Sequence, residues 1–153
     1  MVFVKEELLK LENQLCFPLY AAAKAVVGLY KPLLNTLDLT YTQYIAMMVL
    51  WEERSIGVKA LGERLHLDSG TLTPLLKRLE DKGYVLRERS NEDERAVNIT
   101  VTEAGMQRKE AAADIPLKMR ACLPLSVQEA KTLYNLLYKI LEQSVCPSGE
   151  PAP

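Results

Sequence analysis

Three cysteines are the residues of this chain best suited to chemistry: Cys16, Cys122 and Cys146. An odd number is unusual for a secreted disulfide framework, and in a reducing compartment it favours at least one reactive thiol. As thiolate, a cysteine reacts with peroxide to give a sulfenic acid, which condenses with a second thiol to a disulfide. Cys16 has apolar neighbours, Leu15 and Phe17, which favour an organic peroxide as the oxidant. A small buried core residue is the ordinary alternative for this cysteine.

The first element that must position this chemistry is a long helix. Apolar spacing predicts it from about Gln14 to Leu34. Pro18 requires the helix to begin between residues 13 and 17, because proline is tolerated only near a helix start. Cys16 therefore lies in or beside the first turn, where the positive end of the helix stabilises a thiolate.

The C-terminal part is also predicted to be helical. Thr102 caps a helix that Pro116 is expected to end, and a loop is expected to carry Cys122. A capping box at 126–129 opens a last helix. Residues 146–153, rich in proline, are expected to be a disordered tail.

Residues 40–101 have the order of elements typical of a winged helix-turn-helix. The predicted elements are a helix opened by a capping box at 40–43, a short helix at 58–66, a helix from 68 to Gly83, and hairpin strands at 84–89 and 96–101. This order is more specific than either the helices or the hairpin alone. It predicts that the helix from 68 to Gly83 enters a DNA major groove and that the hairpin reaches the backbone or minor groove.

The helix from 68 to Gly83 carries the candidate DNA-reading surface. Its leucines fall at helical spacing and can face a core, while the opposite face carries hydroxyls and cations. Hydroxyls meet phosphates or base edges, and cations neutralise the backbone. The residues expected to contact DNA, including the hairpin arginines, are Asp68, Ser69, Thr71, Thr73, Pro74, Lys77, Arg78, Arg87, Arg89 and Arg95. A plain surface helix and a mixed-charge ribbon remain the alternatives.

The composition is that of a soluble protein of one domain. The chain has 153 residues, of which 48% are hydrophobic and 25% charged. It contains no membrane-length apolar run and no signal-peptide pattern, so a cytoplasmic protein without a membrane partner is expected. A net charge of −1 does not itself indicate nucleic-acid binding, so a DNA-binding surface needs local clustering of cations. The single His66 has no nearby ligand to suggest a metal, and no fingerprint indicates a cofactor.

Several short motifs resemble one known family. The segments 68–78, 93–95 and 100–105 look like those of the MarR family of bacterial transcription regulators. The segments 11–17, 30–34 and 39–44 are similar to the organic-hydroperoxide repressors, the OhrR type. The resemblance covers roughly residues 8–143, and the segment around Cys16 is the part most specific for that subgroup.

The resemblance implies a homodimeric repressor and not an enzyme. Its fold would be mainly α with a small β-wing, an α+β winged helix-turn-helix with a helical dimerisation region at 14–39 and 102–145. The reduced dimer would bind operator DNA and release it when an organic hydroperoxide oxidises Cys16. No cofactor is implied.

The resemblance also implies roles for the residues around the thiol. Cys16 matches the sensing thiol, Tyr30 and Tyr41 match tyrosines that hydrogen-bond it, and Cys122 matches the resolving thiol of a two-cysteine branch. Cys146 matches no family residue. Core aromatics and a spectator thiol are the alternatives for the tyrosines and Cys122. Cys16 and Tyr30 lie fourteen residues apart on one helix, a rise of ~21 Å, so a contact between them needs the partner chain. We expect an intersubunit disulfide between Cys16 and Cys122.

Two other functions fit parts of the pattern. A thiol peroxidase would use Cys16 catalytically, but it has no use for a DNA-reading helix. A MarR-type regulator gated by a small phenolic ligand would respond to phenols even as a Cys16→Ser variant. Turnover of peroxide would favour the enzyme, and stoichiometric loss of DNA binding would favour the sensor.

Overall fold

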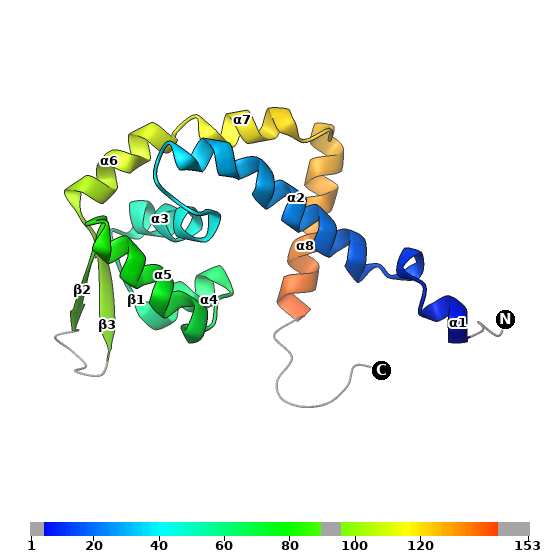
Figure 1. Cartoon of the computed structure of the whole chain (residues 1–153), viewed down its shortest axis with the longest axis horizontal. Helices are drawn as coiled ribbons and strands as arrows, with labels where there is room; N and C mark the ends of the chain where they lie inside the picture. The colour runs from blue at the N-terminus through cyan, green and yellow to red at the C-terminus, as the bar shows by residue number, and fades with distance from the viewer. Residues whose placement is uncertain (1–4, 90–95, 144–153) are drawn as a thin grey trace. The chain divides into compact units, whose positions relative to one another are not determined.

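The computed structural model describes residues 5–89 and 96–143, so Arg95, Cys146 and the expected tail lie outside the described residues. In chain order the elements are α1 (Lys5–Leu8), the 3₁₀ helix η1 (Leu11–Asn13), α2 (Cys16–Asn35), α3 (Tyr41–Glu53), β1 (Ser55–Gly57), α4 (Val58–Leu65), α5 (Ser69–Asp81), β2 (Val85–Arg89), β3 (Val97–Val101), α6 (Glu103–Ala112), α7 (Ile115–Cys122) and α8 (Val127–Gln143) (Figure 1). The chain divides between Met119 and Arg120 into two compact units.

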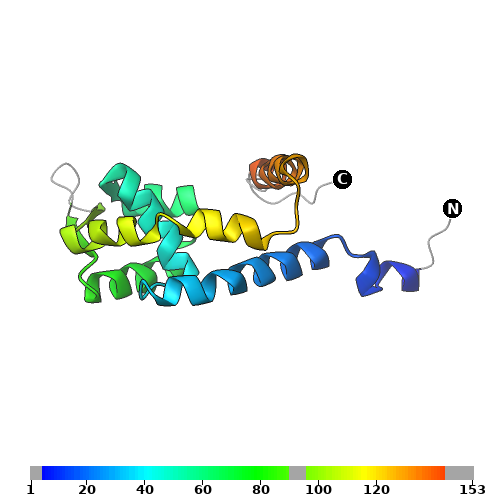
Figure 2. The same cartoon turned by 90° about the horizontal axis from the view of Figure 1, so that it is seen from above.

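The first unit contains the predicted winged helix-turn-helix fold of residues 40–101, together with α2 and α6. Its helices α3, α4 and α5 precede a hairpin of β2 and β3, and the short β1 pairs with the other side of β3. In both views the hairpin and the first turn of α2 lie at opposite ends of this unit (Figure 2). The hairpin and the start of α2 are therefore separated within one chain.

The hydrophobic core of this unit joins the helix-turn-helix to the wing. Leu50, Leu61, Leu76 and Ile99, from α3, α4, α5 and β3, are each at most 1% exposed. Burial of a side chain of this size contributes about 1.5–3 kcal/mol. Because four elements meet in one core, the recognition helix α5 is held at a set position relative to the wing.

Gly105 allows α6 to approach the hairpin closely. A Cβ added there would lie 2.2 Å from the carbonyl oxygen of Tyr84. The Trp51 indole N–H donates to the Gly105 carbonyl oxygen at 2.8 Å, and the Gly105 N–H donates to Thr102 Oγ1 at 3.0 Å. Any larger residue at this position would displace backbone atoms.

The predicted start of α3 and the predicted end of α5 are confirmed. Thr40 and Gln43 form the reciprocal capping box of α3. Gly83, with φ of +72°, follows the end of α5, and its N–H donates to the Glu80 carbonyl oxygen at 2.8 Å. Tyr84 N–H donates to the carbonyl oxygen of Leu79 at 3.0 Å, which completes a glycine-terminated helix end.

The segment around Pro116 corrects the sequence prediction. The helix capped by Thr102 ends at Ala112, and Pro116 is the second residue of a new helix, α7. A proline in a first turn removes no helical hydrogen bond, because that N–H has no intrahelical partner. Cys122 is therefore the last residue of a helix and does not lie in a loop.

The second unit contains α8, opened by the predicted capping box. Ser126 N–H donates to Glu129 Oε2 at 2.9 Å, and Glu129 N–H donates to Ser126 Oγ at 3.3 Å. The rings of Tyr134 and Tyr138 lie 4.5 Å apart between centroids. From Val127 to Glu142, every side chain except that of Leu137 is exposed. The helix is amphipathic, but its apolar side chains lie open to solvent in the single chain.

Candidate functional site

The exposed face of α5 brings most of the predicted DNA-contacting side chains together. Its leucines are buried, which turns the intervening residues outward: Asp68, Ser69, Thr71, Thr73, Pro74, Lys77 and Arg78 are all exposed. Neither of the two cations forms an ion pair with any residue of 5–89 or 96–143. Their charges are free to meet an anionic partner.

Asp68 acts within the protein as the N-cap of α5. Its carboxylate accepts the Thr71 N–H at 2.8 Å and the Thr71 hydroxyl at 3.0 Å. These hydrogen bonds lower the pKa of Asp68 below its ordinary value of 3.8. Because a carboxylate repels phosphate, we expect Asp68 to fix the start of the helix.

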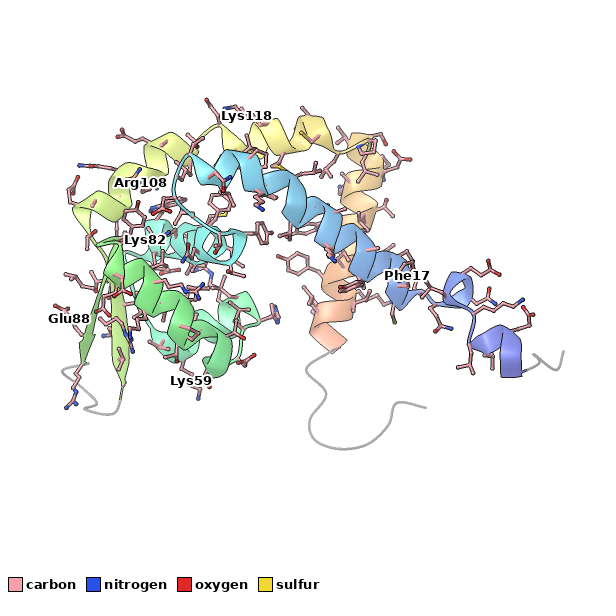
Figure 3. All side chains as sticks on the ribbon, in the orientation of Figure 1. Phe17, Lys59, Lys82, Glu88, Arg108 and Lys118 are labelled. Carbon is pink, nitrogen blue, oxygen red and sulfur yellow. The ribbon has the colours of Figure 1, made fainter. Side chains whose placement is uncertain are left out.

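Strand register places Arg87 and Glu88 on opposite sides of the wing. Arg87 pairs with Ile99 and shares the core-facing side of the sheet, where it is half-buried. Glu88 pairs with Asn98 on the opposite side (Figure 3). Arg89 is exposed at the end of β2, beside the segment that contains Arg95.

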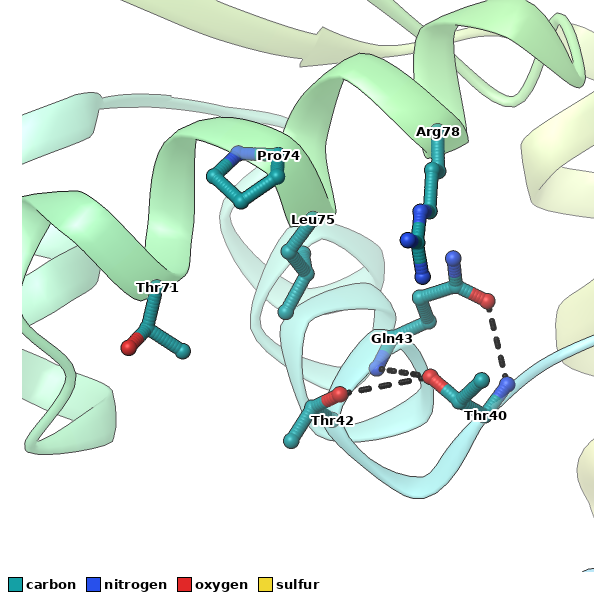
Figure 4. Close-up of a pocket in the computed structure, with 7 residues that line it drawn as sticks. All are labelled: Thr40, Thr42, Gln43, Thr71, Pro74, Leu75 and Arg78. Atoms are coloured by element: carbon teal, nitrogen blue, oxygen red, sulfur yellow. Dashed lines mark hydrogen bonds between the residues drawn. The ribbon is translucent and has the colours of Figure 1, made fainter.

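A cleft of about 210 Å³ lies between the start of α3 and the recognition helix (Figure 4). Its lining residues are Thr40, Thr42, Gln43, Thr71, Pro74, Leu75 and Arg78. Three of them belong to the predicted DNA-facing set. The three from α3 and its cap were predicted only to open a helix.

Cys16 is the first residue of α2 and is exposed. Its neighbour Leu15 is the N-cap and makes no side-chain hydrogen bond to the helix, so the first-turn N–H groups are not capped by it. Leu15 is 82% exposed and Phe17 is 42% exposed (Figure 3). The thiol therefore lies on an open apolar surface at the positive end of a helix, and the buried-core alternative does not hold for the single chain.

The two predicted tyrosines lie together, away from the thiol of their own chain. The rings of Tyr30 and Tyr41 are 4.8 Å apart, and those of Tyr30 and Tyr44 are 5.9 Å apart. Burial, and then proximity to Tyr41, raises the pKa of Tyr30 above 10.0. Cys16 begins the same continuous helix, α2, fourteen residues before Tyr30 and ~21 Å away along its axis. Within one chain the thiol and the tyrosines are not assembled.

Tyr44 was missed by the sequence analysis, although its position three residues after Tyr41 on a helix was a usable signal. Burial raises the pKa of Tyr44, with further contributions from Tyr30 and Tyr41. Its ring also lies 6.1 Å from that of Trp51. The tyrosine pair is therefore tied into the core of the winged region.

The structure shows fewer contacts for the remaining predicted residues. Cys122 is exposed in the second unit. His66 ends α4 in the left-handed conformation with φ of 52°. Within residues 5–89 and 96–143, no three His, Cys, Asp or Glu side chains gather into a group that could hold a metal ion. Over that part of the chain no helix has both the length and the apolar character needed to cross a membrane.

Residues 28–112 match the family described as "Transcriptional regulator SarA/Rot". The chain is 51% identical over 134 residues to the organic hydroperoxide resistance transcriptional regulator of Bacillus subtilis, covering 88% of this chain and 91% of that protein. A match of this length includes the winged region.

Structures of AbfR of Staphylococcus epidermidis share this fold. Reduced AbfR bound to DNA is 38% identical with a TM-score of 0.75, covering 92% of this chain and 98% of that one. Overoxidized AbfR bound to DNA is 37% identical with a TM-score of 0.75, covering 93% of this chain and 100% of that one. The disulfide form of AbfR is 38% identical with a TM-score of 0.58, covering 92% of this chain and 93% of that one.

Proposed function

The chain belongs to the MarR family of transcription regulators, with the organic-hydroperoxide repressors of the OhrR type, and we propose that it represses transcription while its Cys16 is reduced. The observation that carries this proposal is one chain with two exposed features: the uncompensated cationic face of α5 and the thiol at the start of α2. The first binds operator DNA, and the second detects the oxidant.

DNA binding uses two copies of the chain. A two-fold dimer presents two α5 helices to a pseudo-palindromic operator, with half-sites about 34–36 Å apart. The predicted dimerisation region at 14–39 and 102–145 contains exposed apolar residues that such an interface would cover, among them Leu19 and Tyr20 of α2 and Leu136 of α8. The DNA-bound structures of AbfR support DNA as the partner of this chain.

The sensing step oxidises Cys16. Its thiolate attacks one oxygen of an organic hydroperoxide, the O–O bond breaks, and an alcohol leaves after taking up a proton. The sulfenic acid then condenses with the Cys122 thiol of the partner, which forms a disulfide and releases water. Tyr30 and Tyr41 of the partner stabilise the thiolate, since those of the same chain are out of reach.

The disulfide is the step that releases DNA. A disulfide requires Cα atoms within about 4.4–6.8 Å, so closing it moves two helix ends together and changes the spacing of the two α5 helices. Two structures of AbfR support this step: the overoxidized protein is bound to DNA, and a disulfide form also exists, so a disulfide and not oxidation alone is proposed to release DNA.

The test is operator binding measured against a stoichiometric dose of an organic hydroperoxide, with non-reducing electrophoresis of the same samples. Wild type should lose operator binding and run as a covalent dimer, and thiol reductant should restore both. Cys16→Ser should bind operator regardless of peroxide. Cys122→Ser should oxidise at Cys16 without forming the covalent dimer.

Two results would contradict the proposal. A covalent dimer that persists in Cys122→Ser and disappears in Cys146→Ser would move the resolving role to Cys146. Repeated consumption of peroxide by each thiol, with operator binding unchanged, would instead favour the thiol peroxidase.

A further inference from the structure

The cleft between α3 and α5 is lined by Gln43, a buried residue whose side-chain nitrogen remains accessible to solvent. Gln43 is 3% exposed, and its Oε1 accepts the Thr40 N–H at 3.0 Å. This bond fixes the orientation of the amide, because the oxygen must face the cap. The Nε2 group then points into the cleft, without a hydrogen-bond partner among the residues that the structure describes (Figure 4).

Arg78 brings a second set of unmatched donors to the same space. Its guanidinium reaches toward the Gln43 amide nitrogen (Figure 4). Both groups can only donate, so neither satisfies the other. No carboxylate lines the cleft. The cleft also lies at the start of the thirteen-residue helix α3, whose dipole favours negative charge. Converging donors without an acceptor indicate a site for an anion.

The position of the cleft indicates which anion. Thr71 and Pro74 line it from the exposed face of α5, the face that would enter the major groove. Space beside a helix in that groove is bordered by the sugar-phosphate backbone. A free phosphate offers the same oxygens, so the two sources must be distinguished by experiment.

We propose that this cleft binds one phosphate of the operator backbone, held between the Gln43 amide and the Arg78 guanidinium. The inference rests on the proposed function, because it assumes that α5 meets duplex DNA. It assigns to the capping box a second role: the side chain that closes the start of α3 also contacts DNA. Register of α5 in the groove is thereby tied to the position of α3.

Gln43→Glu is the sharpest test of the amide. Glutamate at this position of a capping box is a preferred residue, so the cap of α3 is retained. The donor is replaced by a carboxylate oxygen that faces the phosphate and competes for Arg78. Operator affinity should fall about tenfold to a hundredfold at low salt. Gln107→Glu, on the exposed surface of α6, makes the same change in net charge and should leave affinity unchanged.

The salt dependence reports the loss of a phosphate contact. Each contact contributes about 0.9 to the slope of log affinity against log salt. Between 50 and 200 mM salt, the deficit of Gln43→Glu relative to wild type should therefore shrink about threefold to fourfold. Arg78→Gln should behave in the same way. The double variant should lose less binding free energy than the sum of the two single variants, because both remove one shared phosphate contact. Unchanged slopes in both single variants would overturn the proposal.

A DNA-free measurement separates this proposal from the repressor function. The side-chain amide resonance of Gln43 should shift when inorganic phosphate replaces chloride at equal ionic strength, and Arg78→Gln should abolish that shift. Suppose that this shift is observed but that the slope of log operator affinity against log salt is unchanged in both single variants. The cleft would then bind a free anion, and the proposal that it binds a backbone phosphate would be overturned. If wild type binds no duplex DNA, the repressor proposal fails, and so does the proposal that the phosphate belongs to the DNA backbone. A shift of the Gln43 amide resonance would still identify an anion site.

Discussion

The winged region buries its apolar side chains, whereas the last helix, α8, exposes several of its own. In the winged region Leu50, Leu76 and Ile99 are at most 1% exposed. In α8, Leu133 is 44% and Leu136 is 55% exposed. The first region encloses its own core, whereas α8 leaves unburied a surface that water disfavours. We infer that the first unit, in which α2, α6 and α7 complete this core, is stable by itself and that α8 reaches its final environment only in the dimer.

The largest effect is expected from Gly105→Ala. The added Cβ would lie 2.2 Å from the Tyr84 carbonyl oxygen, so α6 must shift from the hairpin and the free energy of unfolding should fall by about 3 kcal/mol. Urea denaturation followed by Trp51 fluorescence measures the loss. Gly28→Ala in α2 is the control, since a Cβ there meets nothing within 4 Å and alanine favours a helix. Equal stability of Gly105→Ala and wild type would mean that the close approach is absent.

The next effect concerns the dimer and should leave the winged region folded. Leu133→Glu together with Leu136→Glu places charges on the exposed apolar side chains of α8. The dimer dissociation constant should rise at least about a hundredfold, because charge at a buried interface costs several kcal/mol. Sedimentation measures the association, and urea denaturation checks the fold. Gln128→Glu, at the exposed start of α8, should associate like wild type. A double variant that remains dimeric would remove α8 from the interface.

A smaller effect is expected from Trp51→Phe. The change keeps a ring in the core but removes the N–H that donates to the Gly105 carbonyl oxygen at 2.8 Å. A buried acceptor left unpaired costs about 1–3 kcal/mol, so the midpoint of urea denaturation should fall while dimer association does not change. An effect on association with full stability would contradict the separation of the two regions.

The smallest effect is the acid dependence of α5. The folded state lowers the pKa of Asp68 below 3.8, so its carboxylate stabilises the fold above that pH, and the contribution is lost as pH falls through the folded value. Asp68→Asn retains a capping oxygen but does not titrate. The difference in Tm between pH 6 and pH 3 should therefore be smaller in this variant than in wild type. An identical difference in both proteins would show that the cap does not depend on charge.

Local signals predicted most of the elements that position the site. Thr40, Asp68 and Gly83 mark helix ends through bonds within a few residues, and the structure contains those bonds. Pro116 was misinterpreted because proline both ends helices and begins them, and its role depends on which side the helix extends. The resulting error moved Cys122 from a helix into a loop.

Contacts between distant segments could not be predicted from spacing. The Gln43 side chain was recognised as a cap, but its place beside Arg78 arises because α3 and α5 pack together. The contact between Tyr30 and Tyr41 and the bond from Trp51 to Gly105 have the same origin. The contact between Cys16 and Cys122 remains a prediction, because it involves a second chain.

The separation of Cys16 and Tyr30 along α2 has a genetic consequence. If each sensor takes its thiol from one chain and its tyrosine from the other, a Cys16→Ser chain and a Tyr30→Phe chain are each defective alone. In a mixed dimer, one sensor combines both defects, but the other pairs an intact thiol with an intact tyrosine. Two alleles that each fail to respond to peroxide should therefore restore one of the two sensors in every mixed dimer when expressed together, as in intragenic complementation.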